Sequence, residues 1–140
     1  MIRYALAGAL LAGLTAGAAH AEIRKFTAKL DTAQEVPPKA GAGTGTLDAT
    51  LDTASKKLTY TLTFSGLSGP ATSAHFHGPA GMGVVGSVEV PITGLTSPSH
   101  GSATLTKSQV ADMKAGRVYV NIHTAANPGG EIRGQVMPAK

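Results

Sequence analysis

The stretch Leu58-Thr-Tyr-Thr-Leu-Thr-Phe64 decides the fold class. Its apolar residues alternate with threonines, and in a strand this places all the apolar side chains on one face and all the threonines on the other. β-Branched and aromatic residues also favour the pleated backbone of a strand. The stretch therefore predicts a half-buried strand of an antiparallel sheet, with its threonine face toward water.

The segments on both sides of this stretch show the same period of two. Pro91 lies near the end of one of them and indicates an edge strand or a bulge, because proline cannot donate to a ladder. Turn-forming residues separate the segments. Together with 58–64, strands are predicted at 25–31, 46–52, 74–78, 84–92, 102–105, 117–124 and 131–137.

The period changes only once. Thr106 and Gln109 have the spacing of a capping box at the start of a helix, and Gly116 is suited to the left-handed conformation that ends one. We therefore expect one short helix at 107–115. Many short strands, one helix and no β-α-β alternation predict an all-β fold, an antiparallel sandwich or barrel.

The first residues have the three parts of a secretory signal peptide. Met1-Ile-Arg3 is short and positive, 4–14 is apolar, and Ala19-His-Ala21 has the small residues of a cleavage site. The apolar part is shorter than the ~20 residues that span a bilayer. We predict a signal peptide at 1–21, a single domain at 22–140, and export to the periplasm or the extracellular space with no membrane span after cleavage. The alternative is an uncleaved membrane anchor.

Composition excludes several classes of protein. The chain has no cysteine, so its core must be stable without disulfides, and no thiolate is available as a nucleophile or metal ligand. Its net charge of +4 comes from scattered residues, and it has no tryptophan. A nucleic-acid surface needs clustered basic residues and stacking aromatic rings, so we expect no nucleic-acid partner.

Histidines provide the candidate site. His75 and His77 share one face of a predicted strand and stand about 6.6 Å apart along it, close enough for both imidazoles to reach one ion at ~2.0 Å. His123 lies on the corresponding face of a later strand, with Tyr119 and Asn121. Three imidazoles without a thiolate favour copper or zinc over calcium. The alternative is a hydrogen-bonded polar network that holds no ion.

The last predicted strand adds polar residues to the same outer, solvent-facing side of the sheet. Glu131 is a candidate carboxylate ligand or a support for an imidazole. Arg133 is expected to pair with Glu131 or to receive an anionic ligand. The candidate metal ligands are His75, His77 and His123, with support from Glu131, Asn121 and Arg133.

Other motifs do not fit their context. The glycines of 81–86 spell a dinucleotide-binding pattern, but a strand follows where that motif requires a helix. His20 leaves with the signal peptide, and His100 is predicted to lie in a surface turn. The prolines after Glu35 predict a rigid loop, which also offers a surface for a protein contact.

The chain resembles the CHRD domain family, named after chordin, an extracellular antagonist of bone morphogenetic proteins. The resemblance implies an exported all-β domain, which in bacteria often stands alone. Chordin's partners do not transfer to this chain, because other modules of chordin also contact them. The resemblance rests on Glu35-Val-Pro-Pro38, Ala74-His-Phe-His-Gly-Pro79, Tyr119-Val-Asn-Ile-His-Thr124 and Gly130-Glu-Ile-Arg-Gly-Gln135.

Two segments are also similar to copper/zinc superoxide dismutases, which are Greek-key β-barrels, so the likeness implies an antiparallel Greek-key sandwich or barrel of the immunoglobulin or superoxide dismutase type. His75-Phe-His77 is similar to the pair that holds their copper, and 127–134 to the segment of their active-site arginine. The chain lacks their zinc loop, bridging histidine and disulfide. The expected function is therefore non-enzymatic binding of copper, or of zinc, by an exported CHRD-type protein. The alternatives are an extracellular or envelope protein-interaction module with structural histidines and, last, a dismutase-like redox enzyme.

Overall fold

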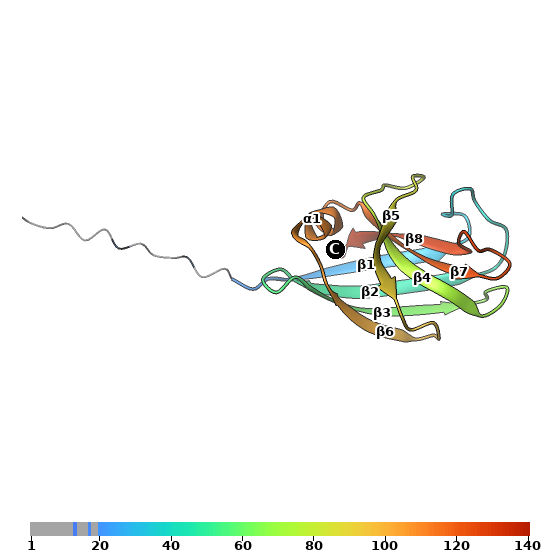
Figure 1. Cartoon of the computed structure of the whole chain (residues 1–140), viewed down its shortest axis with the longest axis horizontal. Coiled ribbons are helices and arrows are strands. Elements are labelled where there is room, and N and C mark those ends of the chain that lie inside the picture. The colour runs from blue at the N-terminus through green and yellow to red at the C-terminus, as the bar shows by residue number, and fades with distance from the viewer. Residues whose placement is uncertain (1–12, 14–16, 18–19) are drawn as a thin grey trace, which may run out of the picture.

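The alternating stretch around Tyr60 forms the strand that the sequence predicts, β3 (Lys57–Ser65). Leu58, Tyr60 and Leu62 are buried, while Thr59 and Thr63 are exposed. The computed structural model describes residues 13, 17 and 20–140 (Figure 1). The predicted signal peptide, 1–21, lies almost entirely outside the described residues.

Within the described residues, eight antiparallel strands form one sheet in the order β5-β4-β7-β8-β1-β2-β3-β6. Three strands form a meander, the chain then crosses to build the opposite half, and β6 returns to pair with β3, which is a Greek-key path. The sheet curls until it is nearly closed, with β5 and β6 as its edges (Figure 1). The all-β prediction is confirmed. Besides β3, the strands are β1 (Ile23–Asp31), β2 (Thr44–Asp52), β4 (Ala71–Gly78), β5 (Ser87–Ile92), β6 (Ser99–Thr104), β7 (Val118–Thr124) and β8 (Ile132–Pro138).

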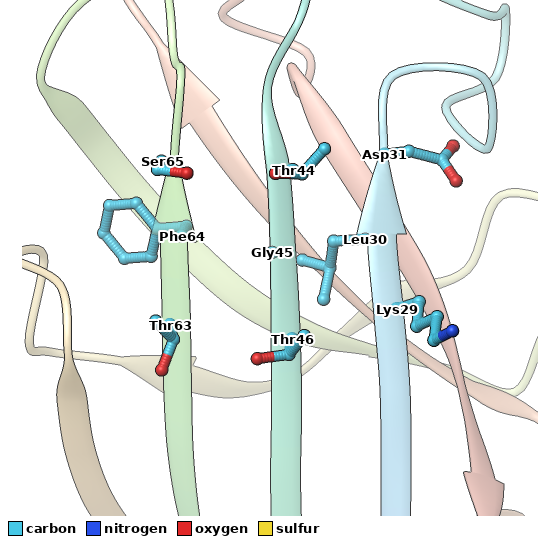
Figure 2. A pocket seen from close by; sticks show the side chains of 9 residues that line it. All are labelled: Lys29, Leu30, Asp31, Thr44, Gly45, Thr46, Thr63, Phe64 and Ser65. Carbon is cyan, nitrogen blue, oxygen red and sulfur yellow. The ribbon is translucent and has the colours of Figure 1, made fainter.

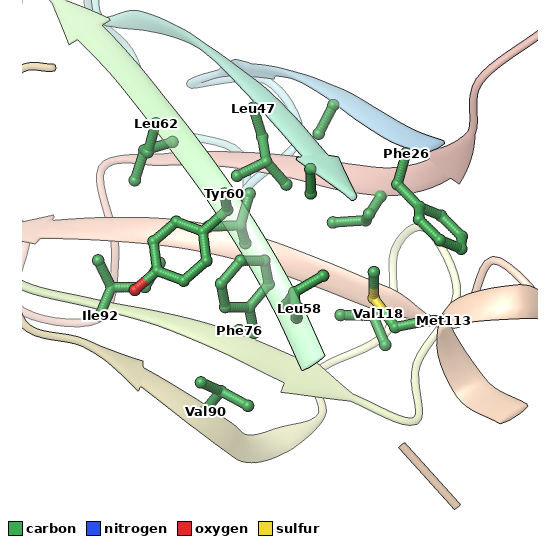
Figure 3. Packing of buried hydrophobic residues seen from close by; sticks show 14 of the residues in the cluster. Phe26, Leu47, Leu58, Tyr60, Leu62, Phe76, Val90, Ile92, Met113 and Val118 are labelled. Atoms are coloured by element: carbon green, nitrogen blue, oxygen red, sulfur yellow. The ribbon is translucent and has the colours of Figure 1, made fainter. Parts of the chain in front are cut away.

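The core lies between the two halves of this sheet (Figure 3). Tyr60 of β3 meets Phe76 of β4 edge to face, with ring centroids 5.2 Å apart. Phe76 points into the core, so the side chains before and after it in β4 point away from the core. These side chains belong to His75 and His77.

The predicted helix is present as α1 (Lys107–Lys114), one residue shorter than expected. Thr106 and Gln109 form the capping box, and Gly116 has a φ of +68°. Val110 and Met113 are buried at the end of the barrel. No helix within the described part of the chain has the length and apolar character needed to cross a membrane.

Three strands begin three residues from their predicted starts: β4 at Ala71, β5 at Ser87 and β6 at Ser99. β5 begins at Ser87, because the chain turns at 81–84, where the Val84 amide donates to the Gly81 carbonyl. The predicted turn at His100 is wrong: β6 includes this residue, which pairs with Thr61 of β3. The ring Nδ1 of His100 lies 3.0 Å from the Thr61 hydroxyl, and this contact holds the imidazole on the threonine face.

Candidate metal centre

The pairing of β4 with β7 brings the three predicted histidines together. His75 lies opposite Asn121, and His123 lies opposite Ser73, one pleat further along the same face. Each of the three imidazoles offers a nitrogen, and these nitrogens all lie within 4.8 Å of one another. The strands therefore create a cluster from two segments that are far apart in the sequence.

His75 and His123 have the spacing of two ligands of one ion. The Nδ1 of His75 lies 3.2 Å from the Nε2 of His123. Two nitrogens bound at ~2.0 Å to a tetrahedral ion lie about 3.3 Å apart. The two rings are nearly perpendicular, at 75°, so their edges rather than their faces meet.

Backbone carbonyls orient two of the imidazoles. The Nδ1 of His77 lies 3.0 Å from the Gly86 carbonyl, and the Nδ1 of His123 lies 2.8 Å from the Pro128 carbonyl. A carbonyl only accepts, so each Nδ1 carries the proton, and in the neutral ring Nε2 then has a free lone pair. A hydrogen bond of this kind, behind the ring, is typical of histidines that bind metals.

The Nε2 of His77 is buried and has no hydrogen-bond partner among the described residues. Leaving a buried acceptor unpaired costs free energy. An ion that shares the lone pair of this atom would remove that cost, so the residues present fit a metal.

Asn121 places an oxygen beside the same nitrogens. Its Oδ1 lies 3.1 Å from the Nε2 of His123, again close to the separation of two ligands. The predicted supporting role of Asn121 therefore has a geometric basis, because Oδ1 is placed as a fourth ligand atom beside the free Nε2 of His123.

Burial favours the neutral form of two of the rings. It lowers the pKa of His75, and the charges of His123 and His77 lower it further. Burial also lowers the pKa of His77, against its hydrogen bond to the Gly86 carbonyl, which raises it. The neutral imidazole is the form that binds metals.

Arg133 acts on this cluster through an aromatic ring. The ring of Tyr119 stacks on His77, with centroids 4.8 Å apart and planes 2° from parallel. The Cζ of Arg133 lies 3.5 Å from the centroid of the Tyr119 ring. Arg133 thus supports His77 by holding Tyr119 in place.

The face that carries the cluster is covered, which corrects the prediction of a solvent-facing side. Tyr119, Asn121, Arg133 and Gln135 are all buried. The loop 79–86 lies over them: the Ala80 carbonyl accepts from Gln135, and the Gly86 amide donates to the Tyr119 hydroxyl. Periodicity separates the two faces of a strand but does not show which loops fold back over one of them.

Glu131 does not belong to the cluster, and its predicted pairing with Arg133 is wrong. Its carboxylate accepts from the Ser68 amide at 3.0 Å, from the Ser68 hydroxyl and from the Asn127 side chain at 2.9 Å. Burial raises its pKa, but these hydrogen bonds outweigh burial and lower it. The chain turns at Gly130, with a φ of +124°, just before Glu131, so this side chain meets the loop before β4.

Glu35 is a buried acidic residue near the site, although the sequence predicted only a loop at this position. Its side chain is 5% exposed, and burial raises its pKa to about 7. A side chain on Gly130 would collide with its Oε1 and with the Asn121 amide, so the three groups meet behind the histidines. The only indication in the sequence was that this carboxylate stands two residues before a pair of prolines, which restrict the backbone of the loop.

A separate hollow of about 450 Å³ lies over the ends of β1, β2 and β3 (Figure 2). Gly45 at its centre has no side chain, and Thr46, Thr63 and Phe64 border it. Its lining contains no histidine and no buried charge, so it adds nothing to the candidate centre.

Comparison with known proteins places the chain in a family. No curated protein and no solved structure matches it. The family model of the CHRD domain matches residues 26–136, which span every strand of the barrel at least in part. The chain belongs to the CHRD domain family.

Proposed function

We propose that this chain is an exported, non-enzymatic CHRD-domain protein that binds a transition metal, copper before zinc, through His75, His77 and His123. The convergence of the three imidazole nitrogens carries the proposal. Nitrogen donors without a thiolate suit Cu²⁺ and Zn²⁺, and copper binds more tightly than zinc to such donors. His75 and His123 are only partly buried, so an ion can enter from solvent.

Three features of the site support binding. The carbonyls of Gly86 and Pro128 hold two rings in the tautomer that leaves Nε2 free. Asn121 offers an oxygen at ligand spacing from His123. The Tyr119 ring and Arg133 hold His77 from behind, so the site does not have to be assembled when the ion arrives.

Metal uptake by the purified chain tests this proposal. Cu²⁺ and Zn²⁺ are titrated into the wild type and the His75→Ala/His77→Ala double variant, with a competing chelator as the reference. Removing a group that only hydrogen-bonds to a metal ligand typically lowers metal affinity by roughly 10- to 100-fold. The double variant lacks two of the ligands themselves, so we expect it to lose more affinity than this.

His100→Ala is the matched control, because His100 lies on β6 outside the cluster. It should bind metal as the wild type does. Equal affinity of the wild type and the double variant for both ions would refute the proposal.

A protein-interaction module of the envelope or extracellular space is the second candidate. It is favoured by four exposed apolar side chains around the start of β5: Met82, Val84, Val85 and Val88. In this account the histidines are structural, and their replacement lowers the melting temperature equally with and without metal. A metal that stabilises the wild type but not the double variant contradicts it, because only binding to the folded state raises stability.

A dismutase-like enzyme is the third candidate. Superoxide turnover by the copper-loaded chain tests it directly. Turnover equal to that of the copper-loaded double variant would exclude it.

A further inference from the structure

A second cavity lies beside the histidine cluster and shares none of its histidines. It has a volume of about 310 Å³, at the small end of the range for ligand pockets. Two loops, 32–43 and 79–86, form its walls together with β8. The residues that give it its chemistry are Gln34, Glu35, Val36, Pro38, Met82 and Arg133.

Arg133 is the unusual group in this cavity. It is only 2% exposed, yet no carboxylate of the described residues lies within 4.0 Å of its guanidinium, since the salt bridges found there join other residues. Its Nη2 donates to the Gly81 carbonyl at 2.9 Å and to Gln135 at 3.5 Å. Its Nε and Nη1 form no hydrogen bond with the described residues. A buried charge without a counter-ion is costly.

The nearest acidic side chain does not fill this role. Glu35 lines the same cavity, but its Oε1 lies against Gly130 and the Asn121 amide, on the side of the histidines. On its other side, Arg133 is covered by the Tyr119 ring, which stabilises the cation from one face only. Donors of a charged guanidinium thus remain available in the cavity.

Apart from the amides of Gln34 and Gln135, the rest of the lining is apolar or has no side chain. Val36, Pro38 and Met82 face the same space, and Met82 is 70% exposed at the rim. Apolar side chains around a buried cation fit a ligand with one anionic end and a hydrocarbon body, because the body gains from leaving water.

We propose that this cavity binds a small organic carboxylate with a short apolar chain. Arg133 holds the carboxylate through a charge-assisted hydrogen bond from Nη1 or Nε, because Nη2 already donates to Gly81 and Gln135. Val36, Pro38 and Met82 contact the apolar chain. The ring of Tyr119 separates this site from His77, so the carboxylate binds without a metal.

Binding of 4-methylpentanoate to the full chain in the presence of EDTA tests the proposal, with NMR titration as the measurement. The matched probe is 4-methylpentanamide, which has the same shape and no charge. We expect the acid to bind with a millimolar dissociation constant and the amide about tenfold more weakly, as the loss of a charge-assisted hydrogen bond implies. Equal binding of acid and amide, or no saturation by either, would overturn the proposal.

Two exposed apolar positions provide variants that keep the fold. Met82→Asp places a negative charge at the rim of the cavity, whereas Val88→Asp changes a residue that is 54% exposed and lies outside the lining. The first should weaken 4-methylpentanoate binding about fivefold or more through charge repulsion, and the second should leave it unchanged. An unchanged dissociation constant in Met82→Asp would contradict the proposal, and the metal proposal would be unaffected because EDTA is present throughout.

Discussion

At the scale of single residues, Glu35 has a strongly perturbed environment near Asn121. Burial raises its pKa from 4.5 to about 7 and outweighs the charges of Arg133 and Lys39, which lower it. The folded state therefore keeps the proton between pH 4.5 and 7, where the unfolded state releases it. In this window Glu35 makes the protein less stable as the pH rises.

Glu35→Gln should remove this loss. Relative to the wild type, its free energy of unfolding is predicted to increase as the pH rises from 4.5 to 7, by on the order of 3 kcal/mol. Urea unfolding at several pH values, in EDTA, measures the difference. The comparison must be made between variant and wild type, because His75 and His77, with lowered pKa values, change stability in the opposite direction over part of this range. A difference that does not vary with pH would contradict the assigned environment of Glu35.

The sequence predicted the histidines better than their carboxylate neighbours. Alternation alone places His75, His77 and His123 on one side of the sheet, and the structure brings them together. It cannot place Glu35 or Glu131, because both lie outside regular strands, where no period relates a side chain to a face. Their partners, Asn121 and Ser68, lie far away in the chain and are set by tertiary folding.

At the scale of elements, α1 shows how a local signal can fix a boundary. The Thr106 hydroxyl accepts from the Gln109 amide, and the Gln109 side chain accepts from the Thr106 amide at 2.9 Å. Both hydrogen bonds depend only on residues three positions apart, so the sequence is enough to predict this end of the helix. Strand ends such as that of β5 depend instead on a partner strand and a loop, and these were predicted less well.

Thr106→Ala removes the capping hydroxyl and should destabilise the protein by about 1 kcal/mol. Thermal or denaturant unfolding gives the value. Lys107→Ala is a suitable control, since this exposed side chain follows the cap and takes no part in it. Equal stability of Thr106→Ala and Lys107→Ala would show that the cap does not stabilise α1.

At the scale of the whole molecule, the two halves of the sheet are held together by the core between them (Figure 3). Which strands pair could not be derived from alternation, because every half-buried strand shows the same pattern. The Greek-key order follows from the connections β3–β4 and β5–β6, which cross between the two halves and whose paths depend on how the halves pack. The pattern of short strands predicted an antiparallel sandwich or barrel, whereas the likeness to superoxide dismutases pointed to its Greek-key path.

The contact of Tyr60 with Phe76 tests this packing, because the two rings come from opposite halves. A double-mutant cycle with Tyr60→Leu and Phe76→Leu is predicted to give a coupling energy of about 0.5 to 1.5 kcal/mol, as for other edge-to-face pairs. A cycle with Phe26→Leu in place of Tyr60→Leu is the control and should give a smaller value. A coupling energy of zero for Tyr60 and Phe76 would be inconsistent with the halves facing each other in this register.

The central claim is that one ion binds where β4 and β7 bring His75, His77 and His123 together. Pulsed electron paramagnetic resonance of the Cu²⁺-loaded chain counts the imidazoles around the ion and tests this claim most directly. We predict a signal from three imidazoles in the wild type and in His100→Ala, reduced to one in His75→Ala/His77→Ala. A wild-type spectrum with one imidazole or none, or one identical to that of the double variant, would contradict the account.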